Sequence, residues 1–83
     1  MQGLMQHHPL MISSVIEFAA TYHGDTEIVS RRVEGDTHRT NYAEVNRRAK
    51  RIANALDAMK IPQSSRVGTL AWNGYRHFEL YYG

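Results

Sequence analysis

Residues 41–60, NYAEVNRRAKRIANALDAMK, carry the strongest pattern in this chain and decide its fold. Apolar side chains recur there at steps of three and four, which predicts an amphipathic helix over residues 42–59. Asn41 is a favoured N-cap residue, and Glu44 stands three positions later, as in a capping box. Glu44 also precedes Arg48 by four residues, the spacing of a helical ion pair. Pro62 cannot continue the helix.

A second helix is predicted upstream, over residues 14–23. Ser14 and Glu17 have the S-x-x-E spacing of a capping box, in which each side chain satisfies a free amide of the other residue. Gly24 follows where a left-handed C-cap residue is expected. Residues 1–13 are predicted to form an extended lead-in, because Pro9 disfavours helix at the residue before it.

The remaining segments predict a hairpin, a strand and a third helix. Residues 27–40 are β-prone on both sides of Glu34-Gly35-Asp36, which predicts a hairpin with Gly35 at positive φ. Residues 67–72 form a nearly continuous apolar run, typical of a strand covered on both faces in a parallel sheet. Residues 75–82 are expected to open another helix, with Asn73 as its cap.

The predicted order is therefore helix, hairpin, helix, strand, helix, in an α/β chain. A strand that is apolar on both faces needs parallel neighbours, and no second segment of that kind is present in the sequence. We therefore expect residues 14–83 to be a truncated, partial portion of a larger domain. The core of that domain is predicted to include Val15, Phe18, Val45, Ile52, Leu56, Val67, Leu70 and Trp72.

Composition excludes several classes of protein. The 83 residues include no cysteine, which excludes disulfides and thiolate zinc sites and is typical of a reducing compartment. Ten Lys and Arg against eight Asp and Glu give a net charge of +2, too even a balance to indicate a nucleic-acid partner. No apolar stretch approaches the roughly 20 residues of a membrane span. We expect a cytoplasmic protein without an integral membrane segment.

No motif in the sequence predicts a catalytic, cofactor-binding or metal-binding residue. The histidines are scattered or adjacent, without the spacing of metal ligands. The basic run over residues 47–51 is predicted to be a solvated outer helix face, because no aromatic residues interleave with it. Asn73-Gly74 has too few glycines for a phosphate cradle, and no serine lies in a G-x-S-x-G elbow. The histidines are His7, His8, His23, His38 and His77.

Two long segments together resemble the start of the AMP-forming acyl-CoA synthetases, within the adenylate-forming superfamily. They are DTEIVSRRVEGDTHRTNYAEVNRRAKRIANALDAMKI, residues 25–61, and RVGTLAWNGYRHFELYYG, residues 66–83. Residues 69–77 are most similar to the fatty acyl-CoA branch. The sequence departs from the family pattern at the turn after the long helix, where Lys60 and Gln63-Ser64-Ser65 replace glycine-containing residues.

The resemblance implies a piece of an enzyme that is inactive alone. Family members use ATP to convert a fatty acid to an acyl-adenylate, and coenzyme A then gives the thioester and AMP. ATP, CoA and Mg²⁺ would be bound by parts of the family's chain that have no counterpart in residues 1–83. The partner of this segment would be the rest of its own synthetase chain, and a homodimer is possible. The alternative is a non-catalytic interaction or oligomerisation module, with an apolar docking strip formed by Leu4, Met5, Leu10, Met11 and Ile12.

Overall fold

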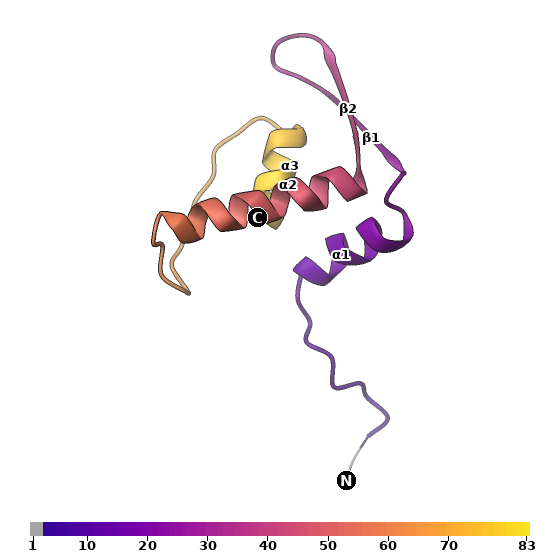
Figure 1. Cartoon of the computed structure of the whole chain (residues 1–83), viewed down its shortest axis with the longest axis vertical. Helices are drawn as coiled ribbons and strands as arrows, with labels where there is room; N and C mark the ends of the chain where they lie inside the picture. The colour runs from indigo at the N-terminus through magenta and orange to yellow at the C-terminus, as the bar shows by residue number, and fades with distance from the viewer. Residues whose placement is uncertain (1–2) are drawn as a thin grey trace.

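A computed structural model describes residues 3–83 as three helices and one hairpin. In chain order these are α1 (Ser13–Tyr22), β1 (Glu27–Arg31), β2 (Thr37–Asn41), α2 (Tyr42–Ala58) and α3 (Tyr75–Tyr82). The long helix α2 is central: α1 packs on it from one side, and α3 crosses it on another (Figure 1). The hairpin β1–β2 extends away from the start of α2. The predicted helices and hairpin are all present, within one or two residues of the expected bounds.

The start of α2 confirms half of the predicted capping box. The Asn41 side chain accepts a hydrogen bond from the Glu44 amide at 2.8 Å, so it caps one of the free N–H groups of the first turn. The Glu44 carboxylate does not reach back to Asn41. It accepts from Arg47 Nε at 3.0 Å instead, while Asn41 also pairs with Glu27 as the last residue of β2.

The end of α2 is a Schellman motif with an unusual residue at its critical position. The amide of Ile61 donates to the Leu56 carbonyl at 3.3 Å, and that of Lys60 donates to the Asp57 carbonyl at 2.9 Å. This pattern requires a left-handed residue after the cap. Lys60 takes that conformation with φ 59°, although glycine adopts it without steric cost. The departure from the family pattern therefore falls on a position that favours glycine.

The predicted capping box of α1 is wrong. The helix begins at Ser13, Ile12 already has helical dihedral angles, and no side chain caps the end. Ser14 is inside the helix, and its hydroxyl donates backward to the Met11 carbonyl at 2.6 Å. Glu17 is held by Lys50 of α2 at 3.2 Å. A turn that starts at Met11 leads directly into the helix, so α1 begins one residue earlier than the S-x-x-E pattern predicts.

Gly24 is not the predicted left-handed cap; it is a point of close contact between α1 and α2. Its φ is not positive; Gly35 alone among the described glycines has a positive φ. A Cβ on Gly24 would lie 2.7 Å from the Ala20 carbonyl oxygen and 3.3 Å from the Ala43 Cβ. The Gly24 carbonyl accepts from the Ala43 amide at 3.1 Å. The missing side chain thus lets the end of α1 contact the start of α2.

The hairpin has the predicted antiparallel pairing. Five residue pairs run from Glu27↔Asn41 to Arg31↔Thr37. The turn closes through Gly35, which donates to the Arg32 carbonyl at 3.0 Å and has φ 98°. Gly35 is therefore the positive-φ residue that the sequence predicts.

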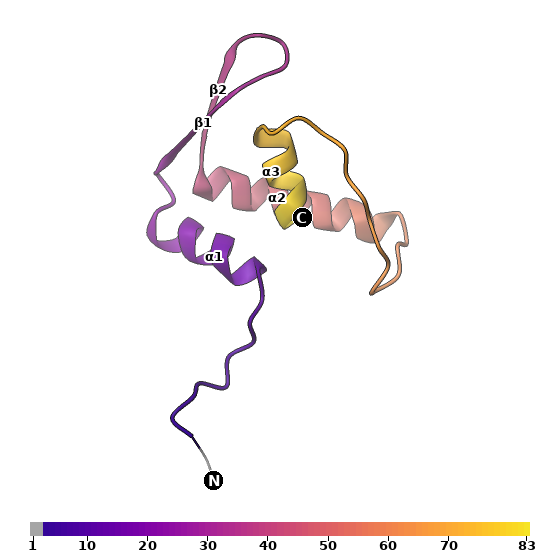
Figure 2. The same cartoon turned by 180° about the vertical axis from the view of Figure 1, so that it is seen from behind.

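The predicted strand over residues 67–72 is not formed. This segment is part of the wide irregular connection between α2 and α3 that Figure 2 shows. The described residues contain one sheet, of β1 and β2 alone, so no strand lies beside it to satisfy its backbone. Its large side chains are in solvent, with Leu70 103% and Trp72 82% exposed. The helix after it has Gly74 as N-cap, without the predicted side-chain cap from Asn73.

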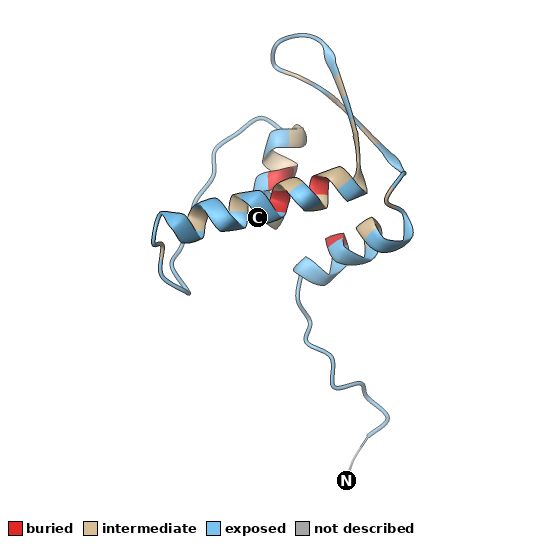
Figure 3. Cartoon of the chain, in the orientation of Figure 1, coloured by how far each residue is buried: buried red, intermediate tan, exposed pale blue. Residues whose placement is uncertain are grey.

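The core of the described residues is small and lies between the helices (Figure 3). Ile16 of α1 and Val45 and Ala49 of α2 are its buried apolar members. Val45 was predicted to be buried. Five other predicted core residues are exposed: Val15, Phe18, Val67, Leu70 and Trp72. Helix α1 presents Ile16 to α2, which leaves Val15 and Phe18 outside the contact. No neighbouring strand covers residues 67–72. Ile52 and Leu56 are half-buried. Over residues 3–83, no helix has the length and apolar character needed to cross a bilayer.

Candidate functional site: the joint between α2, the hairpin and α3

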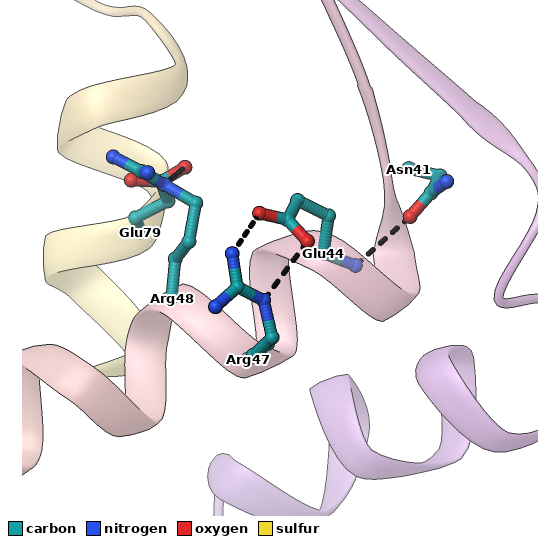
Figure 4. Close-up of polar contacts among 5 residues, drawn as sticks. All are labelled: Asn41, Glu44, Arg47, Arg48 and Glu79. Carbon is teal, nitrogen blue, oxygen red and sulfur yellow. Dashed lines mark hydrogen bonds and ion pairs between the residues drawn. The ribbon is translucent and has the colours of Figure 1, made fainter.

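A buried carboxylate joins α3 to α2. Glu79 is 2% exposed, although it is charged, and Arg48 of α2 donates to its Oε1 from Nε at 2.7 Å (Figure 4). The Glu79 carboxylate, first by this hydrogen bond and then by its charge, raises the pKa of the Arg48 guanidinium. A buried charge is stable only when it is paired and hydrogen-bonded. Arg48 therefore fixes where α3 crosses α2.

The start of α3 is held against the hairpin by stacking and charge. The His38 ring of β2 stacks on Tyr75 with 3.6 Å between ring centroids and 12° between planes. Arg76 donates to Glu34 Oε1 at the hairpin turn, at 2.7 Å. This hydrogen bond, followed by one from the backbone of Glu34 itself, lowers the pKa of the Glu34 carboxyl. The two contacts fix the first turn of α3 while Arg48 fixes the helix further along.

Two hollows border this joint. One, of about 300 Å³, lies between α2 and α3 and is lined by Arg48, Arg51, Ile52, Ala55 and Glu79. The other, of about 210 Å³, lies between the hairpin and the approach to α3 and is lined by residues 31–33 and 71–76. Arg32 on its wall is already paired with Asp36 at 2.7 Å. Neither hollow has a serine or lysine nucleophile among its lining residues.

The basic run is only partly the solvated face that the sequence predicts. Arg47 pairs with Glu44 of its own turn, and Lys50 pairs with Glu17 of α1. Arg48 is turned inward to Glu79, so the predicted Glu44–Arg48 pair is not formed. Three cations of the run, Arg47, Arg48 and Lys50, are thus each matched by a carboxylate of this chain.

The histidines are separated in space as well as in sequence. His38 stacks on Tyr75, and His77 is hydrogen-bonded to the Thr69 hydroxyl at 3.0 Å. In the part of the chain that the structure describes, no three His, Cys, Asp or Glu side chains converge as metal ligands would. The prediction that residues 1–83 hold no catalytic, cofactor or metal ligand stays a prediction.

Sequence reasoning missed all three contacts that define the joint: Arg48 with Glu79, His38 with Tyr75, and Arg76 with Glu34. Arg48 and Glu79 are 31 positions apart, so no helical spacing connects them. One signal was available: Glu79 is the single charge in the run of residues 78–82, and a charge among apolar residues needs a partner. The stack of His38 on Tyr75 had no sequence signal, because stacking depends on how the hairpin and α3 meet.

Comparison with known proteins identifies the class to which this arrangement of helices and hairpin belongs. Residues 16–83 match the family described as AMP-binding enzyme. The chain belongs to the AMP-binding enzyme family.

Several curated relatives are CoA ligases. The chain is 49% identical over 82 residues to the 3-methylmercaptopropionyl-CoA ligase of Ruegeria lacuscaerulensis, which covers 99% of this chain and 15% of the relative. It is 44% identical over 82 residues to the medium-chain-fatty-acid–CoA ligase of Ectopseudomonas oleovorans, with the same coverage of both chains. It is 41% identical over 78 residues to the long-chain-fatty-acid–CoA ligase of Thermus thermophilus, covering 94% of this chain and 14% of the relative. The chain spans about 15% of the length of these relatives, in their amino-terminal part.

Proposed function

We propose that this chain is the amino-terminal part of an ATP-dependent fatty acid–CoA ligase. Residues 1–13 would be an extended lead-in, and residues 14–83 the opening of the synthetase domain. One observation carries the proposal: the family match spans residues 16–83, and the relatives that match over the same region are named CoA ligases. A cytoplasmic location stays a prediction.

The proposed reaction has two steps. A carboxylate oxygen of the acid attacks the α-phosphorus of ATP, the bond to pyrophosphate breaks, and an acyl-adenylate forms. The thiol of coenzyme A then attacks the acyl carbonyl, and AMP leaves with the electron pair of the broken bond. Splitting the reaction in this way replaces one difficult displacement with two easier ones, because the adenylate is a good leaving group.

The part of residues 1–83 in this reaction would be structural. The joint does not fit a Mg²⁺ site, because Mg²⁺ needs free carboxylate oxygens and the carboxylates of the joint are paired with cations. Arg48 holds Glu79, Arg76 holds Glu34, and Arg32 holds Asp36. We therefore assign ATP, CoA and Mg²⁺ to other parts of the protein. The joint would set the angle between α2 and α3, on which the neighbouring sheet would be built.

A transplant experiment tests this role. The 82 residues of this chain that align with the medium-chain-fatty-acid–CoA ligase of Ectopseudomonas oleovorans would replace their counterparts in that enzyme. We expect the chimera to form acyl-CoA from ATP, CoA and octanoate, and the same chimera with Arg48→Met to lose soluble, folded protein. A folded chimera that forms no thioester would contradict the proposed function. An acid series from acetate to palmitate, with 3-methylmercaptopropionate included, would measure the substrate preference.

The isolated 83-residue chain provides the complementary test. With ATP, a fatty acid and labelled pyrophosphate, we expect no ATP–pyrophosphate exchange, because we assign the groups that adenylation needs to other parts of the protein. Exchange above a heat-treated control would place reacting groups within residues 1–83 and overturn the structural role.

A further inference from the structure

We draw no further inference here: the strongest candidate, the hollow of about 210 Å³ between the hairpin turn and the approach to α3, lined by Arg31, Arg32, Trp72 and Arg76 among others, is walled by the connection that has no neighbouring strand in a chain spanning about 15% of its relatives, and nothing in the structure shows what covers it.

Discussion

Replacing Arg48 with methionine removes the cation that neutralises the buried Glu79 carboxylate and keeps most of the side chain's volume. The wild-type pair is joined at 2.7 Å, and the Glu79 side chain is 3% exposed while that of Arg48 is 42% exposed. Methionine can fill the space of the arginine stem but offers no donor. The variant must therefore either keep an unpaired carboxylate between α2 and α3 or separate the two helices.

The cost lies between two measured limits. Removing one partner of a fully buried pair costs about 3–5 kcal/mol, while exposed pairs contribute about 0–1 kcal/mol. The Glu79 side chain is fully buried and the Arg48 side chain is partly exposed. We therefore expect a loss of about 2–3 kcal/mol in the free energy of unfolding. For a chain of this size, about 4–8 °C per kcal/mol converts this loss into a fall in Tm of roughly 10–20 °C.

Urea and thermal unfolding followed by circular dichroism would measure this difference. Arg51→Met is the matched control: Arg51 is exposed on the next turn of α2, and its replacement should change stability by less than about 0.5 kcal/mol. Adding Glu79→Leu to Arg48→Met should recover most of the loss, because the unpaired charge is gone. Equal, small effects of Arg48→Met and Arg51→Met would refute the argument that the ion pair holds α3.

Three further changes test the helix ends and the hairpin contact. Asn41→Ala should lower the unfolding free energy by about 1 kcal/mol in urea titrations, because the Glu44 amide loses its cap. Lys60→Gly should raise it by about 0.5–1 kcal/mol, since φ 59° at this residue suits glycine; unchanged or lower stability would contradict the Schellman assignment. The depressed pKa of Glu34 contributes stability that is present above its ordinary value of 4.5 and is lost as the pH falls through the folded value. Glu34→Gln should flatten this acid-side decline in a pH series of urea midpoints, and an unaltered decline would exclude the Arg76 contact as its source.

Local patterns were enough to predict the helices and the hairpin. The three-and-four spacing over residues 42–59 and the cap at Asn41 are properties of one segment, and the structure confirms both. Gly35 could be placed because a tight hairpin turn requires positive φ. The start of α1 could not, since Ser14 and Ser13 are equally plausible boundaries until the turn from Met11 is known.

Contacts between distant segments were beyond sequence reasoning. Arg48 has Glu44 four residues before it, the local partner that helix spacing favours, yet it pairs with Glu79 because α3 crosses α2 at that turn. The apolar run over residues 67–72 was predicted as a strand from its composition alone. A strand also requires a neighbour, and the described residues supply none for it.

The contact between Gly24 and Ala43 brings together the two ends of the segment that contains the hairpin, so this segment is a closed loop. The main chain departs after Gly24 and is back within hydrogen-bonding distance, 3.1 Å, at Ala43. The crossing of α1 and α2 is therefore fixed by the residues that flank the hairpin and does not depend on the hairpin's length. Added residues at Gly35 would lengthen a closed loop, which costs little because closure entropy grows only slowly with loop length. Insertions at the hairpin turn should therefore be tolerated without a change in the packing of α1 on α2.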